Sequence, residues 1–178
     1  MADRRLTGVL LVGGASERFG SPKALARFRG ETLAERAWRV LHEACDEVLA
    51  VGKTADSLPL PFPVLDDGSP ERAPVFGVLA GLRAAARDVV VFLPVDCPLL
   101  TAEALRALGE AVAVPQTGPL PGAYAKAHLP LLEERVARGE LSLWGVNGTV
   151  LELDERLLAD LDTPEDLAAL SSPRSPSS

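Results

Sequence analysis

One segment near the start of the chain combines glycines with positive side chains, as a phosphate-binding loop does. It runs from Leu11 to Lys23 and reads LVGGASERFGSPK. Glycine lets backbone N–H groups approach phosphate oxygens closely, and Arg18 and Lys23 add positive charge to the same loop. The segment is not a Walker A loop, because no Ser or Thr follows Lys23, and it lacks the Gly-x-Gly-x-x-Gly pattern of dinucleotide-binding loops. A bare pair of glycines could be structural, but this combination predicts a phosphate-binding loop.

A second segment places a carboxylate where a metal could bind. Asp96 follows the apolar run from Asp88 to Val95 and precedes Cys97 and Pro98. If that run is a central parallel strand, Asp96 lies at its carboxyl end, where open α/β sheets bind their ligands. Mg²⁺ prefers oxygen ligands and typically takes one or two carboxylates together with substrate phosphates. Asp96 is therefore the candidate metal ligand, with an Asp that only caps a turn as the alternative. Cys97 is given no role.

Two further pairs of acids stand at predicted turns. Asp66 and Asp67 follow a short apolar segment, and either a solvated turn or a ligand contact would explain them. Asp160 and Asp162 precede a predicted helix that has its own threonine cap and a proline in its first turn, so that helix start does not require them. One of the first pair, and Asp162 of the second, are candidate metal or ligand contacts around the proposed cleft.

The elements that must position these residues alternate between strands and helices. Short runs of apolar and β-branched residues predict strands at 6–12, 47–51, 64–65, 88–95, 111–114, around Tyr124 and at 150–153. Helical spacing of apolar residues predicts helices at 31–45, 75–87, 102–110, 129–138 and 163–170. This alternation predicts a single Rossmann-like, three-layer α/β domain with a mostly parallel central sheet, spanning residues 1–170. The Ser/Pro-rich residues 171–178 are expected to form a disordered tail.

Composition excludes several other classes of protein. The chain has 178 residues, 18 of them Lys or Arg and 25 Asp or Glu, for a formal net charge of −7. That excess argues against binding nucleic acid or an anionic membrane surface. No apolar run approaches the roughly 20 residues of a membrane span. Two cysteines, Cys45 and Cys97, cannot form a disulfide framework, so we expect a reducing, cytoplasmic setting.

These motifs together resemble the nucleotidyltransferases typified by molybdenum cofactor guanylyltransferase. That family opens with Leu-Ala-Gly-Gly-x-Ser-x-Arg-Met-Gly-x-x-Lys, which residues 11–23 follow with valine for alanine and phenylalanine for methionine. It also carries Asp-x-Pro, matched by Asp96-Cys97-Pro98, and an Asp followed by Gly-Pro-Leu-x-Gly, partly matched by residues 67–77. The resemblance spans residues 6 to 170.

The resemblance implies a fold of the nucleotide-diphospho-sugar transferase type and a role for each matched residue. It implies that Asp96 binds Mg²⁺, that Arg18 and Lys23 grip the triphosphate, and that Asp67, or Asp66 after a shift of one residue, contacts the nucleotide. The nucleotide-contacting residues at the first strand would be Leu11, Val12, Gly13 and Gly14. The implied reaction transfers GMP from GTP to molybdopterin cofactor and releases pyrophosphate, with transient contacts to other cofactor-biosynthesis or acceptor proteins.

Residues 160–164 leave alternatives open. Their Asp-x-Asp-Thr-Pro sequence looks more like the related cytidylyltransferases than the Asn-x-Asn-Thr-Pro of guanylyltransferases. A nucleotidyltransferase that uses CTP or another phosphate acceptor is therefore one alternative. A non-catalytic cofactor-binding protein is a second, although the pairing of Lys23 with Asp96 speaks against it. A dehydrogenase-type domain is weakened by the missing dinucleotide fingerprint.

Overall fold

A five-stranded sheet forms the centre of the molecule. The computed structural model describes residues 5–13 and 21–171. The strands are β1 (Leu6–Leu11), β4 (Glu47–Gly52), β5 (Leu65–Asp66), β6 (Val89–Pro94) and β8 (Gly122–Ala125). They lie in the order β5-β4-β1-β6-β8. The first four run parallel, and β8 pairs antiparallel with β6. The predicted mostly parallel sheet is therefore confirmed.

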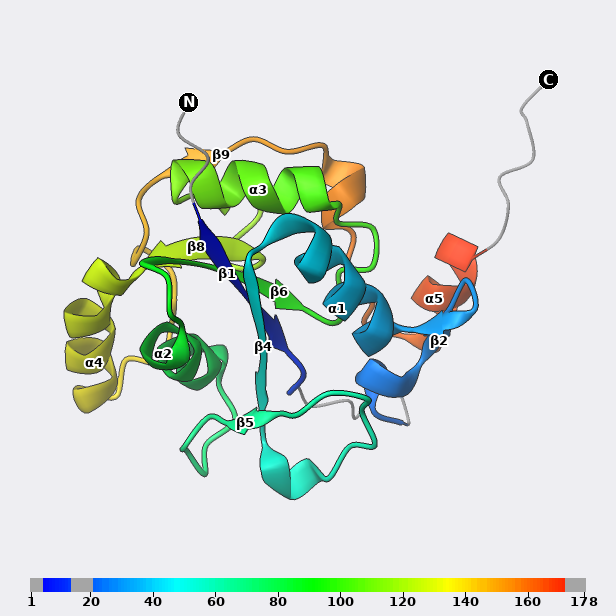
Figure 1. Ribbon diagram of the computed structural model, residues 1–178, viewed down its shortest axis with the longest axis horizontal. Coiled ribbons are helices and arrows are strands. Elements are labelled where there is room, and N and C mark those ends of the chain that lie inside the picture. Colours follow the sequence, from blue (N-terminus) through cyan, green and yellow to red (C-terminus); the bar gives the residue numbers. More distant parts are fainter. Residues whose placement is uncertain (1–4, 14–20, 172–178) are drawn as a thin grey trace.

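Helices cover both faces of this sheet, which makes three layers (Figure 1). The helices are α1 (Leu33–Ala44), α2 (Pro74–Ala84), α3 (Ala102–Ala111) and α4 (Leu129–Ala137). Side chains alternate between the faces along a strand, so Leu6 and Leu10 of β1 pack with α1 and α3, while Val9 and Leu11 pack with α2. The central strand β1 is buried along its whole length, as the apolar runs of a two-sided parallel sheet require.

Local sequence explains where α1 begins. Thr32 Oγ1 accepts a hydrogen bond from Glu35 N at 3.1 Å, and the Glu35 carboxylate accepts one from Thr32 N at 2.9 Å. This reciprocal capping box satisfies two N–H groups that a helix start would otherwise leave without partners. A threonine side chain caps the start of both α1 and α3.

We expect Thr32→Ala to lower the free energy of unfolding by about 1 kcal/mol, because an N-terminal N–H of α1 loses its acceptor. Urea denaturation followed by circular dichroism would measure the loss. Glu35→Gln is the matched control, since glutamine can still reach back to the Thr32 N–H. A Thr32→Ala midpoint equal to that of the wild type would show that the cap contributes nothing.

Several peripheral elements differ from the prediction. Ala111 is the last residue of α3, and Val112 caps the helix with a φ of +48°, so the strand predicted at 111–114 starts only at Val114. That strand, β7 (Val114–Pro115), pairs parallel with β9 (Val150–Leu151) in a separate sheet. Two short strands, β2 (Arg27–Phe28) and β3 (Glu31–Thr32), were not predicted from the pattern. The last helix, α5 (Pro164–Ser171), runs one residue into the predicted tail, and the rest of that tail lies outside the described residues.

Within residues 5–13 and 21–171, none of the helices has the length and apolar character that crossing a membrane would require.

Candidate active site

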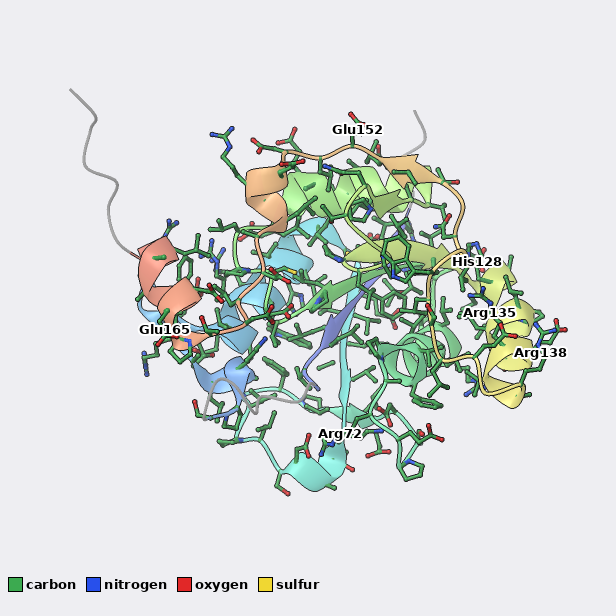
Figure 2. All side chains as sticks on the ribbon, turned by 180° about the vertical axis from the view of Figure 1, so that it is seen from behind. Arg72, His128, Arg135, Arg138, Glu152 and Glu165 are labelled. Atoms are coloured by element: carbon green, nitrogen blue, oxygen red, sulfur yellow. The ribbon has the colours of Figure 1, made fainter. Side chains whose placement is uncertain are left out.

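The main cavity lies at the carboxyl edge of the parallel strands, where the sheet pattern predicted ligand binding. Its volume is about 660 Å³. Its lining comes from the ends of β1, β4 and β6, the start of α2 and two later loops, and includes Leu11, Gly13, Lys23, Lys53, Asp67 and Asp96. In Figure 2 Arg72, another lining residue, lies at this edge, whereas Glu152 lies at the opposite side of the molecule.

Two glycines that line the cavity pack closely against side chains at the end of β1. A Cβ on Gly52 would meet Val12 Cγ2 at 2.6 Å, and a Cβ on Gly77 of α2 would meet Leu11 Cδ2 at 2.8 Å. Glycine at both positions therefore lets the strands and α2 approach closely. Leu11 and Gly13 line the cavity, whereas the side chain of Val12 is buried in the core on the α1 side. Gly14 and Arg18 lie outside the described residues.

Lys23 lies between two carboxylates that come from distant parts of the chain. Its Nζ is 3.8 Å from Asp96 Oδ2 and 3.2 Å from Asp162 Oδ1. Asp160 also lines the cavity. Leu161 holds residues 160–162 beside Asp96. Its N–H donates to Asp96 O at 2.9 Å, and its side chain is buried against Phe28. The structure therefore brings together Lys23, Asp96 and both acids that the helix start left unexplained.

Burial dominates the electrostatics of Asp96. Desolvation raises the pKa of its carboxyl above the usual value, the Lys23 ammonium opposes that shift, and Asp160 and Asp162 add to it. Burial also raises the pKa of the neighbouring Cys97 thiol well above its ordinary value, so this cysteine is not an activated nucleophile. A cation that approaches Asp96 would meet a concentration of negative charge that Lys23 offsets only in part.

The donor set fits a magnesium ion that arrives with its substrate. Among residues 5–13 and 21–171, no three or more His, Cys, Asp or Glu side chains gather into a preformed metal cage. Mg²⁺ does not need such a cage, because it commonly takes one or two carboxylates and completes its shell with phosphate oxygens and water. Asp96, desolvated and crowded by other carboxylates, has the chemistry to supply that oxygen ligand.

The structure separates Asp66 from Asp67. The Asp66 carboxylate turns away and accepts hydrogen bonds from Thr54 Oγ1 at 2.7 Å, Thr54 N at 2.9 Å and Gly68 N at 2.8 Å. These hydrogen bonds lower the pKa of Asp66 to about 2, and the bond from the Thr54 hydroxyl has the largest effect. Asp67 instead lines the cavity, with its side chain only 8% exposed. Of the two residues proposed as ligand contacts, only Asp67 is therefore placed for that role.

Two cationic residues of the cavity were missed by sequence reasoning. Lys53 directly follows β4 and Arg72 stands just before α2, and both line the cavity. The position of Lys53 carried the same signal as that of Asp96, namely a polar residue at the end of an apolar strand. Arg72 offered no such signal, because only the fold of residues 66–73 brings it to the cavity.

Comparisons with known proteins give the family. The MobA-like NTP transferase domain matches residues 8–149. A relative from Aquifex aeolicus, named "Probable molybdenum cofactor guanylyltransferase", is 32% identical over 176 residues, covering 90% of this chain and 88% of the relative. The crystal structure of molybdopterin-guanine dinucleotide biosynthesis protein A from Archaeoglobus fulgidus superposes with a TM-score of 0.76 at 20% identity, covering 93% of this chain and 96% of that one. Rv0371c from Mycobacterium tuberculosis, solved in complex with manganese, superposes with a TM-score of 0.63 at 21% identity, covering 94% and 98%.

The match is not confined to one motif. The family domain contains Lys23, Asp67 and Asp96, and the two solved structures show that the nucleotide-diphospho-sugar transferase fold is shared over nearly the whole chain. The chain therefore belongs to the MobA-like NTP transferase family and is a nucleotidyltransferase related to the molybdenum cofactor guanylyltransferases.

Proposed function

We propose that this nucleotidyltransferase transfers GMP from GTP to molybdopterin cofactor, giving molybdopterin guanine dinucleotide and pyrophosphate, and that it requires Mg²⁺. The observation that carries the proposal is the position of Lys23 beside Asp96 on a cavity at the carboxyl edge of the sheet. The name of the Aquifex relative supports guanine as the base and the cofactor as the acceptor.

The reaction needs no activated side chain. The terminal phosphate of the acceptor is already anionic at neutral pH, so one of its oxygens attacks the α-phosphorus of the nucleotide in line. A new P–O bond forms while the bond from the α-phosphorus to the bridging oxygen breaks, and the electron pair leaves with pyrophosphate. Catalysis then depends on positioning and on charge stabilisation.

The residues of the chain would supply those two effects. Lys23 and the backbone N–H groups near Gly13 would neutralise charge on the triphosphate as it develops, with Arg18 in the same role. Asp96 would hold Mg²⁺ together with phosphate oxygens, and the ion would neutralise the negative charge of the phosphates. Manganese bound to the Mycobacterium tuberculosis protein supports the expectation of a divalent ion at this fold's active site.

One observation favours CTP as a second candidate nucleotide. Two residues depart from the guanylyltransferase pattern, and both lie near the cavity: Asp162 is 3.2 Å from Lys23, and Asp160 is a lining residue. An aspartate beside Lys23, in place of the asparagine of guanylyltransferases, fits the use of a different nucleotide.

A panel of nucleotides monitored by pyrophosphate release would test the proposal. With Mg²⁺ and molybdopterin cofactor present, we expect GTP to be used with a kcat/KM at least about tenfold above those for CTP, ATP and UTP. A control without the cofactor gives the background hydrolysis of each nucleotide. Preference for CTP would contradict the guanylyltransferase assignment, and binding of GTP without any turnover would support the non-catalytic alternative.

A further inference from the structure

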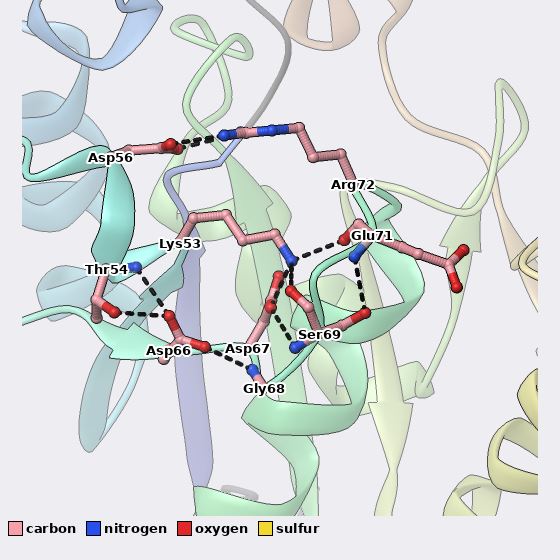
Figure 3. A network of polar contacts seen from close by, with 9 residues as sticks. All are labelled: Lys53, Thr54, Asp56, Asp66, Asp67, Gly68, Ser69, Glu71 and Arg72. Atoms are coloured by element: carbon pink, nitrogen blue, oxygen red, sulfur yellow. Dashed lines mark hydrogen bonds and ion pairs between the residues drawn. The ribbon is translucent and has the colours of Figure 1, made fainter.

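Lys53 lines the cavity, and its ammonium is held by three acceptors of the protein. Its Nζ donates to Asp67 Oδ1 at 2.7 Å, to Glu71 O at 2.7 Å and to Ser69 O, so all three N–H donors of the ammonium are used (Figure 3). The side chain is only 11% exposed. Because its three donors are all engaged inside the protein, Lys53 acts most directly on the groups that it holds.

The first of those groups is Asp67. Lys53 binds one of the two carboxylate oxygens of Asp67 and leaves the other without this contact. Oδ1 accepts from both Lys53 Nζ and Ser69 N, the latter at 3.0 Å. In the described part of the chain, Oδ2 receives no hydrogen bond, although Asp67 lines the cavity. Asp67 therefore has one oxygen engaged with the protein and one oxygen without a protein donor among the described residues, and the largely buried ammonium of Lys53 lies beside it.

The second group is the loop that leads from Asp67 to the start of α2. The two carbonyls that Lys53 holds belong to Ser69 and Glu71, and the next residue, Arg72, forms a two-bond ion pair with Asp56 at 2.6 and 3.2 Å. The exposed Arg72–Asp56 pair contributes little, since surface ion pairs are weak. The more protected tie is Lys53, which binds Asp67, Ser69 and Glu71 of a loop that also carries Arg72 and Ala73 of the cavity wall.

We propose that Lys53 is a positioning residue for nucleotide binding. It holds Asp67 and the 67–72 loop so that Asp67 Oδ2 accepts a hydrogen bond from an N–H or O–H of the base or ribose. This inference rests on the proposed function for the identity of the ligand. Because Lys53 acts on binding rather than on the transferred phosphoryl group, it should affect KM for the nucleotide more than kcat.

Lys53→Met is the test, because methionine keeps most of the side-chain length and removes the charge and the donors. We expect KM for the nucleotide to rise about tenfold or more, the effect of losing a charge-assisted hydrogen bond, with a much smaller change in kcat. Lys53→Arg should not rescue KM, since a planar guanidinium cannot replace a compact ammonium with three acceptors around it. We also expect trypsin to cleave after Arg72 faster in Lys53→Met, with less protection by Mg²⁺ and GTP.

Leu132→Ala is the matched control for stability. Leu132 is fully buried in the core on the α4 side, so its truncation destabilises the fold without touching the cavity. If Leu132→Ala raised KM as much as Lys53→Met, or if folded Lys53→Met kept the wild-type KM and cleavage pattern, the assignment of Lys53 would be overturned. If the wild type bound no nucleoside triphosphate in equilibrium dialysis, both this inference and the proposed function would fail. Turnover with a normal KM in Lys53→Met overturns only the former.

Discussion

Asp96→Ala is expected to abolish pyrophosphate release and leave the protein folded. The carboxylate lies at the end of β6, partly buried and beside Lys23. Without it, the metal-bound triphosphate would lose its only expected protein ligand at the central strand. Release of pyrophosphate at saturating GTP, Mg²⁺ and molybdopterin cofactor would measure the effect.

The fold should survive this change for a physical reason. Burial raises the pKa of Asp96, so at pH 7 its ionised form is less favourable in the folded state than in the unfolded chain. Removing that charge therefore does not remove a favourable contribution to folding, and Lys23 keeps Asp162 as a partner. An unchanged circular dichroism spectrum and melting curve would check this.

Two controls make the Asp96 result specific. Asp96→Asn keeps the size of the side chain and removes its charge, so it should be nearly as inactive as Asp96→Ala. Asp66→Asn removes an exposed carboxylate at the same edge of the sheet, outside the cavity lining, and should retain activity. Full activity in Asp96→Ala would overturn the metal assignment.

Lys23→Ala is expected to lose most of the rate. Its ammonium is the described cation closest to Asp96, and its side chain is 16% exposed, so it acts in a partly desolvated site where charge stabilisation is strong. The loss should appear in kcat, because the interaction strengthens as charge develops on the phosphates in the transition state. The kinetics of pyrophosphate release at saturating nucleotide would measure it.

Lys126→Ala is the matched control for Lys23, since it removes a lysine that does not line the cavity. It should behave as the wild type. If Lys23→Ala reduced kcat less than about tenfold, or about 1.4 kcal/mol of transition-state stabilisation, Lys23 would be peripheral to the reaction. Lys23→Ala removes the ammonium beside Asp96 and Asp162, and this loss is expected to destabilise the variant. Kinetic measurements well below its melting temperature separate that effect from a loss of catalysis.

Local patterns predicted the framework well because each depends on residues close together in the chain. The buried run that forms β1 is confirmed, and the capping box at Thr32 is likewise formed by residues close together in the chain. Prediction was poorer for short peripheral elements such as β7 and β9, because two-residue strands carry too few residues to show a period. In this pairing Val114 lies opposite Val150, which is 36 residues further along the chain. No local pattern in the sequence records such a contact.

The sequence by itself determined the alternation of strands and helices, and it predicted a phosphate-binding segment and a metal ligand at Asp96, because these follow from residue type and position relative to an apolar run. Only the tertiary structure decided between Asp66 and Asp67, placed Asp162 against Lys23 and revealed Lys53. Each of those outcomes depends on a contact between distant segments, such as Leu161 N with Asp96 O, or on which way a loop turns a side chain. The spacing of residues along the chain does not say which way a side chain points. Asp66 and Asp67 therefore look equivalent in the sequence, and only the folded loop around Lys53 distinguishes them.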